Sequence, residues 1–234
     1  MPLAALKDIC IDASDLDRTA GFWQLALHAE RTRHRTHPEL WWLTPGIEDA
    51  PVMWINDVPD APPPVKTRVH LDLRLGPGET IAPLVAAGAT VLLEPRPDEK
   101  WWLMRDPEGN EFCVFAPDGR PPRLYELVVD ARDGAAQARW WREILGGDVE
   151  ESGDFAAVRN GAGQTFDYFV FQNVPEPKTV KNRLHWDVTL TGATPDTLVT
   201  AGATVLRAPD ADNRWWIMAD PEGNEFCAFP PPAS

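Results

Sequence analysis

The sequence predicts an α+β protein built from four βαβββ modules, with two modules in each half of the chain. Two observations lead to this prediction. The octet DPEGNEFC occurs at 106–113 and again at 220–227, nearly half a chain apart in 234 residues. In addition, short apolar runs separated by turn residues follow one helical pattern in each module.

The repeat covers the whole chain and indicates a tandem duplication. AGATVL stands at 87–92 and at 201–206, and the residues around both octets also match. A Pro- and Gly-containing segment at 116–123 has the composition of a linker. We therefore expect one domain at 1–118 and a second at 122–234.

The first half shows the module pattern twice. Ser14 or Asp15 begins a helix that carries Leu16, Ala20, Trp23 and Leu27 on one face, and Gly88 ends a second, shorter helix at 80–89. The predicted strands are 7–13, 40–43, 52–56, 68–75, 90–95, 101–105 and 111–115. The second half repeats this order.

The octet itself predicts a tight hairpin turn. Proline follows aspartate, and Gly109 is free to adopt a positive φ, so the segment joins two antiparallel strands. The simplest reason for writing it twice is that both copies of the fold need the same turn.

Composition excludes several classes of function. With 36 acidic against 22 basic residues, the net charge of -14 repels nucleic acids and anionic membrane surfaces. No apolar run is long enough to span a bilayer and the start does not resemble a secretion signal, so we expect a cytoplasmic protein. The cysteines Cys10, Cys113 and Cys227 are widely spaced, which favours free thiols.

The chain resembles the vicinal oxygen chelate superfamily, which includes glyoxalases, bleomycin resistance proteins and extradiol dioxygenases. The resemblance rests on FW in the first helix, HLDL at the start of the second module and the DPEGNEF hairpin, and it covers nearly all of the chain. It implies U-shaped mixed sheets whose concave faces, here called cups, hold a small molecule, often with a divalent metal such as Zn, Mn, Ni or Fe.

The resemblance also implies where metal ligands would stand. The matching positions are Asp8, Asn56, His70 and Cys113 in the first half, and Glu126, Gln172, His185 and Cys227 in the second. Cysteine replaces the usual acid of the last strand, so no metal is assigned with certainty, and His70, Asp8, His185 and Glu126 are its candidates.

Strand alternation predicts that His70 points into a cup. His70, Asp72 and Arg74 share one face of their strand, while the intervening apolar residues share the face that packs on the helices. If the first and last strands of a module are neighbours, His70 and Cys113 come within reach of each other.

Each candidate has a structural and a chemical interpretation. His70 and His185 either form hydrogen bonds inside the cup, contact a ligand or bind a metal. Cys113 and Cys227 are either small buried apolar residues or nucleophiles.

Asp8 and Glu126 keep an acid at one repeat position. Such an acid is either a general base with a raised pKa or a carboxylate that faces water at the start of a strand.

Tryptophan pairs predict an aromatic wall. Trp101 and Trp102, like Trp215 and Trp216, precede the hairpins, and adjacent residues of a strand face opposite ways. One ring of each pair therefore enters the core and the other lines the cup, beside Asn56 or Gln172. The basic segment Arg31 to His37 is expected to be a solvated strand edge.

Three hypotheses about function follow. The protein binds a small aromatic or apolar molecule without reaction; or it is a metal-dependent lyase, isomerase or dioxygenase that uses His70 with Asp8, or His185 with Glu126; or one half is a structural scaffold. We expect a monomer or homodimer with a small-molecule ligand and no nucleic acid or membrane partner.

Overall fold

The computed structural model describes residues 1–37, 39–46, 51–60 and 65–231, and it contains the four predicted βαβββ modules. Module 1 comprises β1 (Ala4–Ala13), α1 (Leu16–Ala26), β2 (Ala29–Arg33), β3 (Leu40–Pro45) and β4 (Val52–Asp57). Module 2 comprises β5 (Val69–Arg74), α2 (Ala82–Ala86), β6 (Thr90–Leu93), β7 (Trp101–Arg105) and β8 (Glu111–Phe115). Module 3 comprises β9 (Arg123–Ala131), α3 (Gly134–Leu145), β10 (Asp148–Ser152), β11 (Phe155–Arg159) and β12 (Tyr168–Asn173). Module 4 comprises β13 (Leu184–Leu190), α4 (Pro195–Thr200), β14 (Thr204–Arg207), β15 (Trp216–Ala219) and β16 (Glu225–Phe229).

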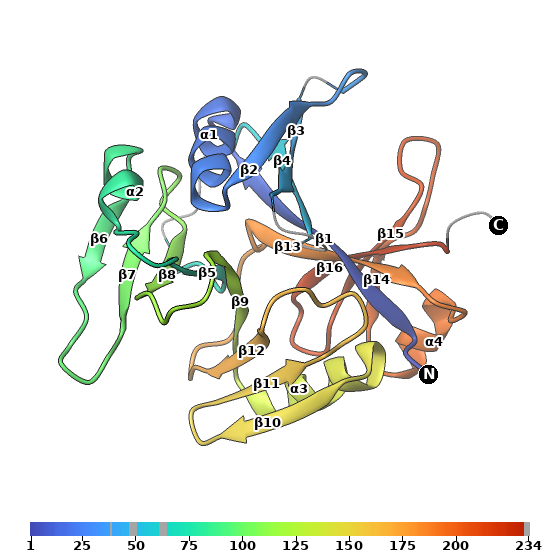
Figure 1. Cartoon of the computed structure of the whole chain (residues 1–234). Helices are drawn as coiled ribbons and strands as arrows, with labels where there is room; N and C mark the ends of the chain where they lie inside the picture. The colour runs from blue at the N-terminus through green and yellow to red at the C-terminus, as the bar shows by residue number, and fades with distance from the viewer. Residues whose placement is uncertain (38, 47–50, 61–64, 232–234) are drawn as a thin grey trace.

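The modules combine crosswise into two mixed sheets of eight strands. The first sheet has the order β14-β15-β16-β13-β1-β4-β3-β2 and joins modules 1 and 4. The second has the order β10-β11-β12-β9-β5-β8-β7-β6 and joins modules 2 and 3. Figure 1 shows the N-terminal strand β1 beside β13 from the other half of the chain. Neither sheet is therefore built from one half of the sequence alone.

Two antiparallel pairings hold each sheet together at its centre. In the first sheet β1 pairs with β13, which places Cys10 opposite His185. In the second sheet β5 pairs with β9, which places His70 opposite Val128. Within each module the first and fourth strands are parallel neighbours, which is the arrangement needed to bring His70 and Cys113 together.

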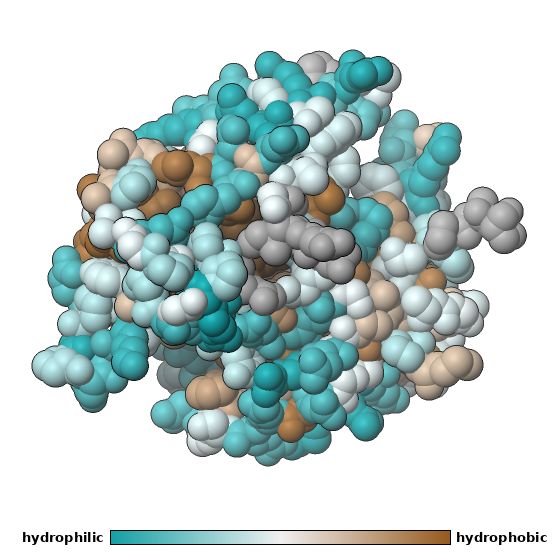
Figure 2. Space-filling model, viewed as in Figure 1, coloured by the Kyte–Doolittle hydropathy of each residue, from teal (hydrophilic) through white to brown (hydrophobic). Residues whose placement is uncertain are grey.

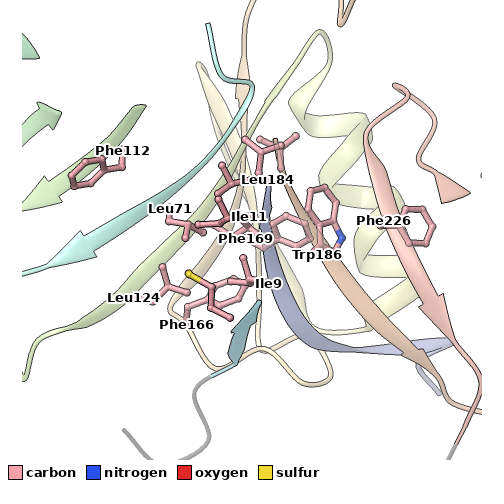
Figure 3. Packing of buried hydrophobic residues seen from close by; sticks show 14 of the residues in the cluster. Ile9, Ile11, Leu71, Phe112, Leu124, Phe166, Phe169, Leu184, Trp186 and Phe226 are labelled. Carbon is pink, nitrogen blue, oxygen red and sulfur yellow. The ribbon is translucent and has the colours of Figure 1, made fainter. Parts of the chain in front are cut away.

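The hydrophobic core lies between the two sheets. Ile9 and Ile11 of β1 meet Leu71 of β5, Phe169 of β12 and Trp186 of β13, all of which are at most 2% exposed. Figure 3 shows these side chains converging between the strands, with α3 behind them. Because one face of each central strand is committed to this core, its other face forms the floor of a cup.

The repeated octet joins the two modules of each half. Asp106 is buried, and its carboxylate accepts hydrogen bonds from the backbone N–H groups of Glu108 and Asn110, both at 2.9 Å, and from Nε1 of Trp23 in α1 at 3.1 Å. The following Gly109 has φ +91°, as predicted for the turn. The motif is thus a tight turn that also fixes the helix of the preceding module.

The glutamate of the octet completes this contact. The carboxylate of Glu108 accepts hydrogen bonds from the backbone N–H groups of Ser14 and Asp15, at 2.9 and 2.8 Å, where α1 begins. In the second half Glu222 accepts from the N–H groups of Arg132 and Asp133 before α3. Each acid satisfies backbone donors that no helical carbonyl reaches.

The surface is predominantly hydrophilic on the face drawn in Figure 2, with apolar side chains gathered around α2. Val85 of α2 and Leu93 of β6 are among the exposed large apolar residues. Of the described helices, none has the length and apolar character needed to cross a bilayer.

We predict that Asp106→Ala lowers the free energy of unfolding by about 2–4 kcal/mol, because it leaves buried N–H donors without an acceptor. Urea unfolding followed by circular dichroism measures the change. The exposed Asp98 provides the control, and Asp98→Ala should shift stability by less than about 0.5 kcal/mol. Equal effects of the two substitutions would contradict the role given to Asp106.

Candidate functional site

The first cup is the face of the first sheet that points away from the core. Along β1 the alternation places Ile9 and Ile11 in the core and Asp8 and Cys10 in the cup. On β13 the same rule places Trp186 in the core and its neighbours on the opposite face. These neighbours, His185 and Asp187, lie beside β1 and next to β16.

A cavity of about 710 Å³ opens over this floor. Its lining comes from both halves of the chain and comprises Lys7, Cys10, His34, His37, Glu39, Leu40, Trp54, Asn56, His185, Asp187, Asp212, Arg214, Trp215, Cys227 and Phe229. A second cavity of about 480 Å³ shares Asn56, His185 and Cys227 with the first. The volumes are in the range of small-molecule sites.

Aromatic rings flank the cavity on two sides. On the β4 side, Trp54 meets Trp42 edge to face with ring centroids 5.5 Å apart, and His34 lies 5.5 Å from Trp42. On the β16 side, Trp215 stacks on Phe229 with centroids 5.0 Å apart and planes at 21°. The polar floor of β1 and β13 lies between these walls because β13 and β1 stand between β16 and β4 in the sheet.

Cys10, His185 and Asp187 form a compact cluster on the floor. One ligand atom of each lies within 4.8 Å of the others, and the Cys10 thiol donates to Oδ2 of Asp187 at 3.6 Å. Nδ1 of His185 and Oδ1 of Asp187 are buried and have no hydrogen-bond partner among the described residues. Such atoms are costly to bury unless something binds them.

The electrostatics of the floor reflect burial and crowded acids. Burial, with help from the nearby Asp8 carboxylate, raises the pKa of Asp187 to about 7. Burial lowers the pKa of His185 to about 4, so its imidazole is neutral at physiological pH. Burial and then Asp187 raise the pKa of both Cys10 and Cys227, so both are thiols in the protein without bound ligands.

The second cup contains the same His-x-Asp sequence in a closed arrangement. Nδ1 of His70 lies 2.8 Å from Oδ1 of Asp72, and the backbone N–H of Cys113 donates to that oxygen at 3.0 Å. Burial acts to lower the pKa of His70, but the carboxylate of Asp72 outweighs it, so the pKa is raised. His70 and Cys113 are thus within reach of each other, as predicted.

Apolar side chains fill the centre of the second cup. Val128, Ala157 and Val170 form a separate small cluster, and Tyr168 packs against it. In strand register these three residues occupy the places that Cys10, Trp42 and Trp54 hold in the first cup.

The crosswise sheets change which predicted residues meet. His185 shares the first cup with Asp8, and His70 shares the second with Glu126, so the expected pairs His70–Asp8 and His185–Glu126 are wrong. Pairing a histidine with the acid of its own sequence half fails because β1 hydrogen-bonds to β13 and β5 to β9.

Neither acid faces water at the start of a strand. Asp8 is buried, and its carboxylate accepts a hydrogen bond from Nε1 of Trp54 at 3.0 Å. Glu126 is half-buried, and burial, followed by the charges of Asp72 and Asp167, raises its pKa to about 8. A carboxyl group with this pKa is largely protonated near neutral pH.

The predicted binding residues divide between the cups. Trp215, Cys227 and Asn56 line the 710 Å³ cavity, whereas Trp216 packs against the core. In the second sheet Trp102 packs against the core and Trp101 pairs with Phe115, while Cys113 is half-buried and Gln172 is exposed. Each tryptophan pair sends one ring to the core, as alternation requires.

Several cavity residues are not identified by the sequence patterns. His34 and His37 line the cavity, so the basic segment is more than a solvated strand edge. Cys10 belongs to no motif, although its alternation with Ile9 and Ile11 places it on the cup face. Trp54, Asp187 and Arg214 likewise carry no motif, and only the fold brings them together.

The metal positions implied by the family resemblance do not form a donor set in the first cup. Asp8 is held by Trp54 and by the ammonium group of Lys7, and Nδ2 of Asn56 donates to Oδ1 of Asp12 at 3.4 Å. Within residues 1–37, 39–46, 51–60 and 65–231, candidate ligand clusters occur at other positions, namely Cys10–His185–Asp187 and His70–Asp72–Cys113. The side chains at the family positions of this cup therefore do not fit a metal ion.

Comparison with known proteins gives a consistent picture of the fold. A family model described as "Glyoxalase-like domain" matches residues 8–115 and 126–229. Among curated proteins, none matches the chain.

Two solved structures share the architecture along the whole chain. Glyoxalase I from Zea mays is 15% identical with a TM-score of 0.66, covering 96% of this chain and 92% of its own. A putative dioxygenase from Bacillus subtilis subsp. subtilis str. 168 is 13% identical with a TM-score of 0.66, covering 100% of this chain and 87% of its own. At these identities the likeness concerns the fold alone.

We predict that Glu126→Gln changes how stability depends on pH. The Glu126 carboxyl titrates near 4.5 when unfolded and near 8 when folded, so between these values only the folded state keeps the proton. The wild-type protein therefore loses stability as pH rises through this range, and Glu126→Gln lacks that loss. Urea unfolding of both proteins from about pH 5 to about pH 9 tests this; a stability difference that does not vary with pH would contradict it.

Proposed function

The chain belongs to the glyoxalase-like family of the vicinal oxygen chelate superfamily, and on that premise we propose that its first cup binds a small aromatic or apolar organic molecule. Membership confirms the resemblance drawn from the FW, HLDL and DPEGNEF motifs. The observation that carries the proposal is the 710 Å³ cavity between two aromatic walls.

The shape and chemistry of the cavity support a ligand with a flat apolar body. The Trp54 and Trp215–Phe229 walls offer ring faces and edges, which favour aromatic partners in stacked or edge-to-face geometry. The floor between them adds a few polar groups, among them His185 and Asp187, that can orient one substituent. A mostly apolar lining with a few convergent polar groups is the usual composition of a small-molecule site.

Charged groups at the cavity make the ligand's polar end a matter of position. Lys7 and Arg214 bring positive charge to the lining, while Glu39, Asp187 and Asp212 bring negative charge. Lys7 lies with its ammonium group 4.6 Å from the centre of the Phe229 ring. A planar ligand at this wall would compete with that cation for the ring face.

A second candidate function is catalysis of a lyase, isomerase or dioxygenase type in the same cup. It is favoured by the buried, unpartnered atoms of His185 and Asp187, since pKa values shifted by burial are common at catalytic sites. Consumption of a compound that binds in the cup, lost in His185→Ala while binding persists, would favour catalysis over binding alone. Binding without consumption leaves the first function as the better account.

We predict that Trp215→Ala weakens binding of planar aromatic compounds by about tenfold, because an aromatic contact contributes about 1 kcal/mol beyond the area it buries. A thermal-shift panel of aromatic compounds, with chelator present, finds the ligand, and titration of tryptophan fluorescence measures its affinity. Trp101 occupies the same repeat position in the second cup, so Trp101→Ala is the matched control.

The control should bind as the wild-type protein does. Weaker binding in Trp101→Ala with unchanged binding in Trp215→Ala would move the site to the second cup. A panel in which no compound raises the melting temperature would count against the proposal.

A further inference from the structure

We propose that the floor of the first cup is a two-thiol site for a zinc-class metal ion, bound by Cys10, His185, Asp187 and Cys227. The site lies beneath the proposed organic ligand, but it does not require that ligand. It also differs from the metal positions that the family resemblance implies, because Cys10 and Asp187 stand two residues along their strands from Asp8 and His185.

The four side chains come from three neighbouring strands and face the same cavity. Cys10 of β1 is opposite His185 of β13 in the sheet register, and Asp187 is opposite Cys227 of β16. All four line the 710 Å³ cavity, which gives an ion a path from solvent. Ligand atoms of Cys10, His185 and Asp187 are already within 4.8 Å of one another.

The floor holds polar atoms that nothing in the described part of the chain satisfies. Asp187 is 4% exposed, and its Oδ1 has no hydrogen-bond partner; Nδ1 of His185 is in the same condition. In the second cup the same pair of residue types bonds internally, since His70 meets Asp72 at 2.8 Å. Two side chains that hydrogen-bond to each other in one cup are therefore left open in the other, beside two thiols.

The donor set selects the class of ion. Two sulfurs, one imidazole nitrogen and one carboxylate oxygen match the four ligands that Zn²⁺ accepts in tetrahedral sites, and the sulfurs disfavour Mg²⁺ and Ca²⁺. On binding, the Cys10 and Cys227 thiols release their protons to solvent and bind as thiolates, and Asp187 binds as a carboxylate. The resulting three negative charges offset the ion and remove the unpaired buried oxygen.

The donors at the family positions are otherwise engaged. Asp8 is bound by Trp54 and Lys7, and the Asn56 amide is bound to Asp12. An ion at those positions would have to break these contacts, whereas an ion at the proposed site need only displace the Cys10 proton from Asp187.

The duplication provides a matched substitution. Val128 occupies in the second sheet the position that Cys10 occupies in the first, opposite the histidine. Cys10→Val therefore copies a residue that this fold already accepts at that place. Cys113→Ala removes the thiol that corresponds to Cys227 from the second cup and leaves the first intact.

The experiment uses the full chain, freed of metal by chelator and titrated with Co²⁺ and then Zn²⁺ without any organic compound. We expect one tight Co²⁺ per chain, with thiolate-to-cobalt charge-transfer absorption and the intense visible bands of a tetrahedral ion, displaced by Zn²⁺. Cys10→Val and Cys227→Ala should each weaken binding by at least about tenfold and reduce the charge-transfer band. Asp8→Asn and Cys113→Ala should leave both unchanged.

Three results would overturn the site: no charge-transfer band, a band that survives Cys10→Val, or binding lost in Asp8→Asn but kept in Cys10→Val. Circular dichroism and urea unfolding of the metal-free variants show whether each still folds. Failure of the metal site is separable from failure of the proposed function, because the aromatic compounds are tested with chelator present and the metal is tested alone.

Discussion

The crosswise pairing of β1 with β13 and of β5 with β9 is the constraint on which the rest of the structure depends. It makes each sheet from modules of both halves, and it commits Ile9 and Trp186 of the first sheet and Leu71 of the second to one shared core. Once those faces are buried, strand alternation leaves no choice about what lines the cups. The cluster of Cys10, His185 and Asp187 exists because two strands far apart in sequence are neighbours in space.

The two cups show how a duplicated fold diverges without losing its frame. Both retain a His-x-Asp sequence on the central strand and a cysteine on the strand beside it. The second cup places Val128, Ala157 and Val170 on its floor, and these side chains pack together. The first cup has Cys10, Trp42 and Trp54 at those positions, where aromatic rings stand as walls around a cavity.

The octet is retained in both halves for two physical reasons at once. Its aspartate and glycine build the turn, while its aspartate and glutamate also bind the helix of the preceding module through Trp23 or Trp141 and through backbone N–H groups. A substitution in the octet therefore disturbs both the turn and the packing between modules. The turn can be predicted from the sequence but the helix contact cannot, because the partner residues lie far away along the chain.

The sequence by itself determined the duplication, the four modules, the turn at Gly109 and the direction in which His70 points. These follow from repeat spacing and from the two-residue period of a strand, which are local properties of a chain. The tertiary structure alone decided that His185 meets Asp8 and Cys10 and not Glu126. It alone raised the pKa of Glu126 to about 8 and opened one cup while filling the other. Pairing between distant strands and the burial of charge depend on which surfaces meet, and no period within a segment of sequence encodes that.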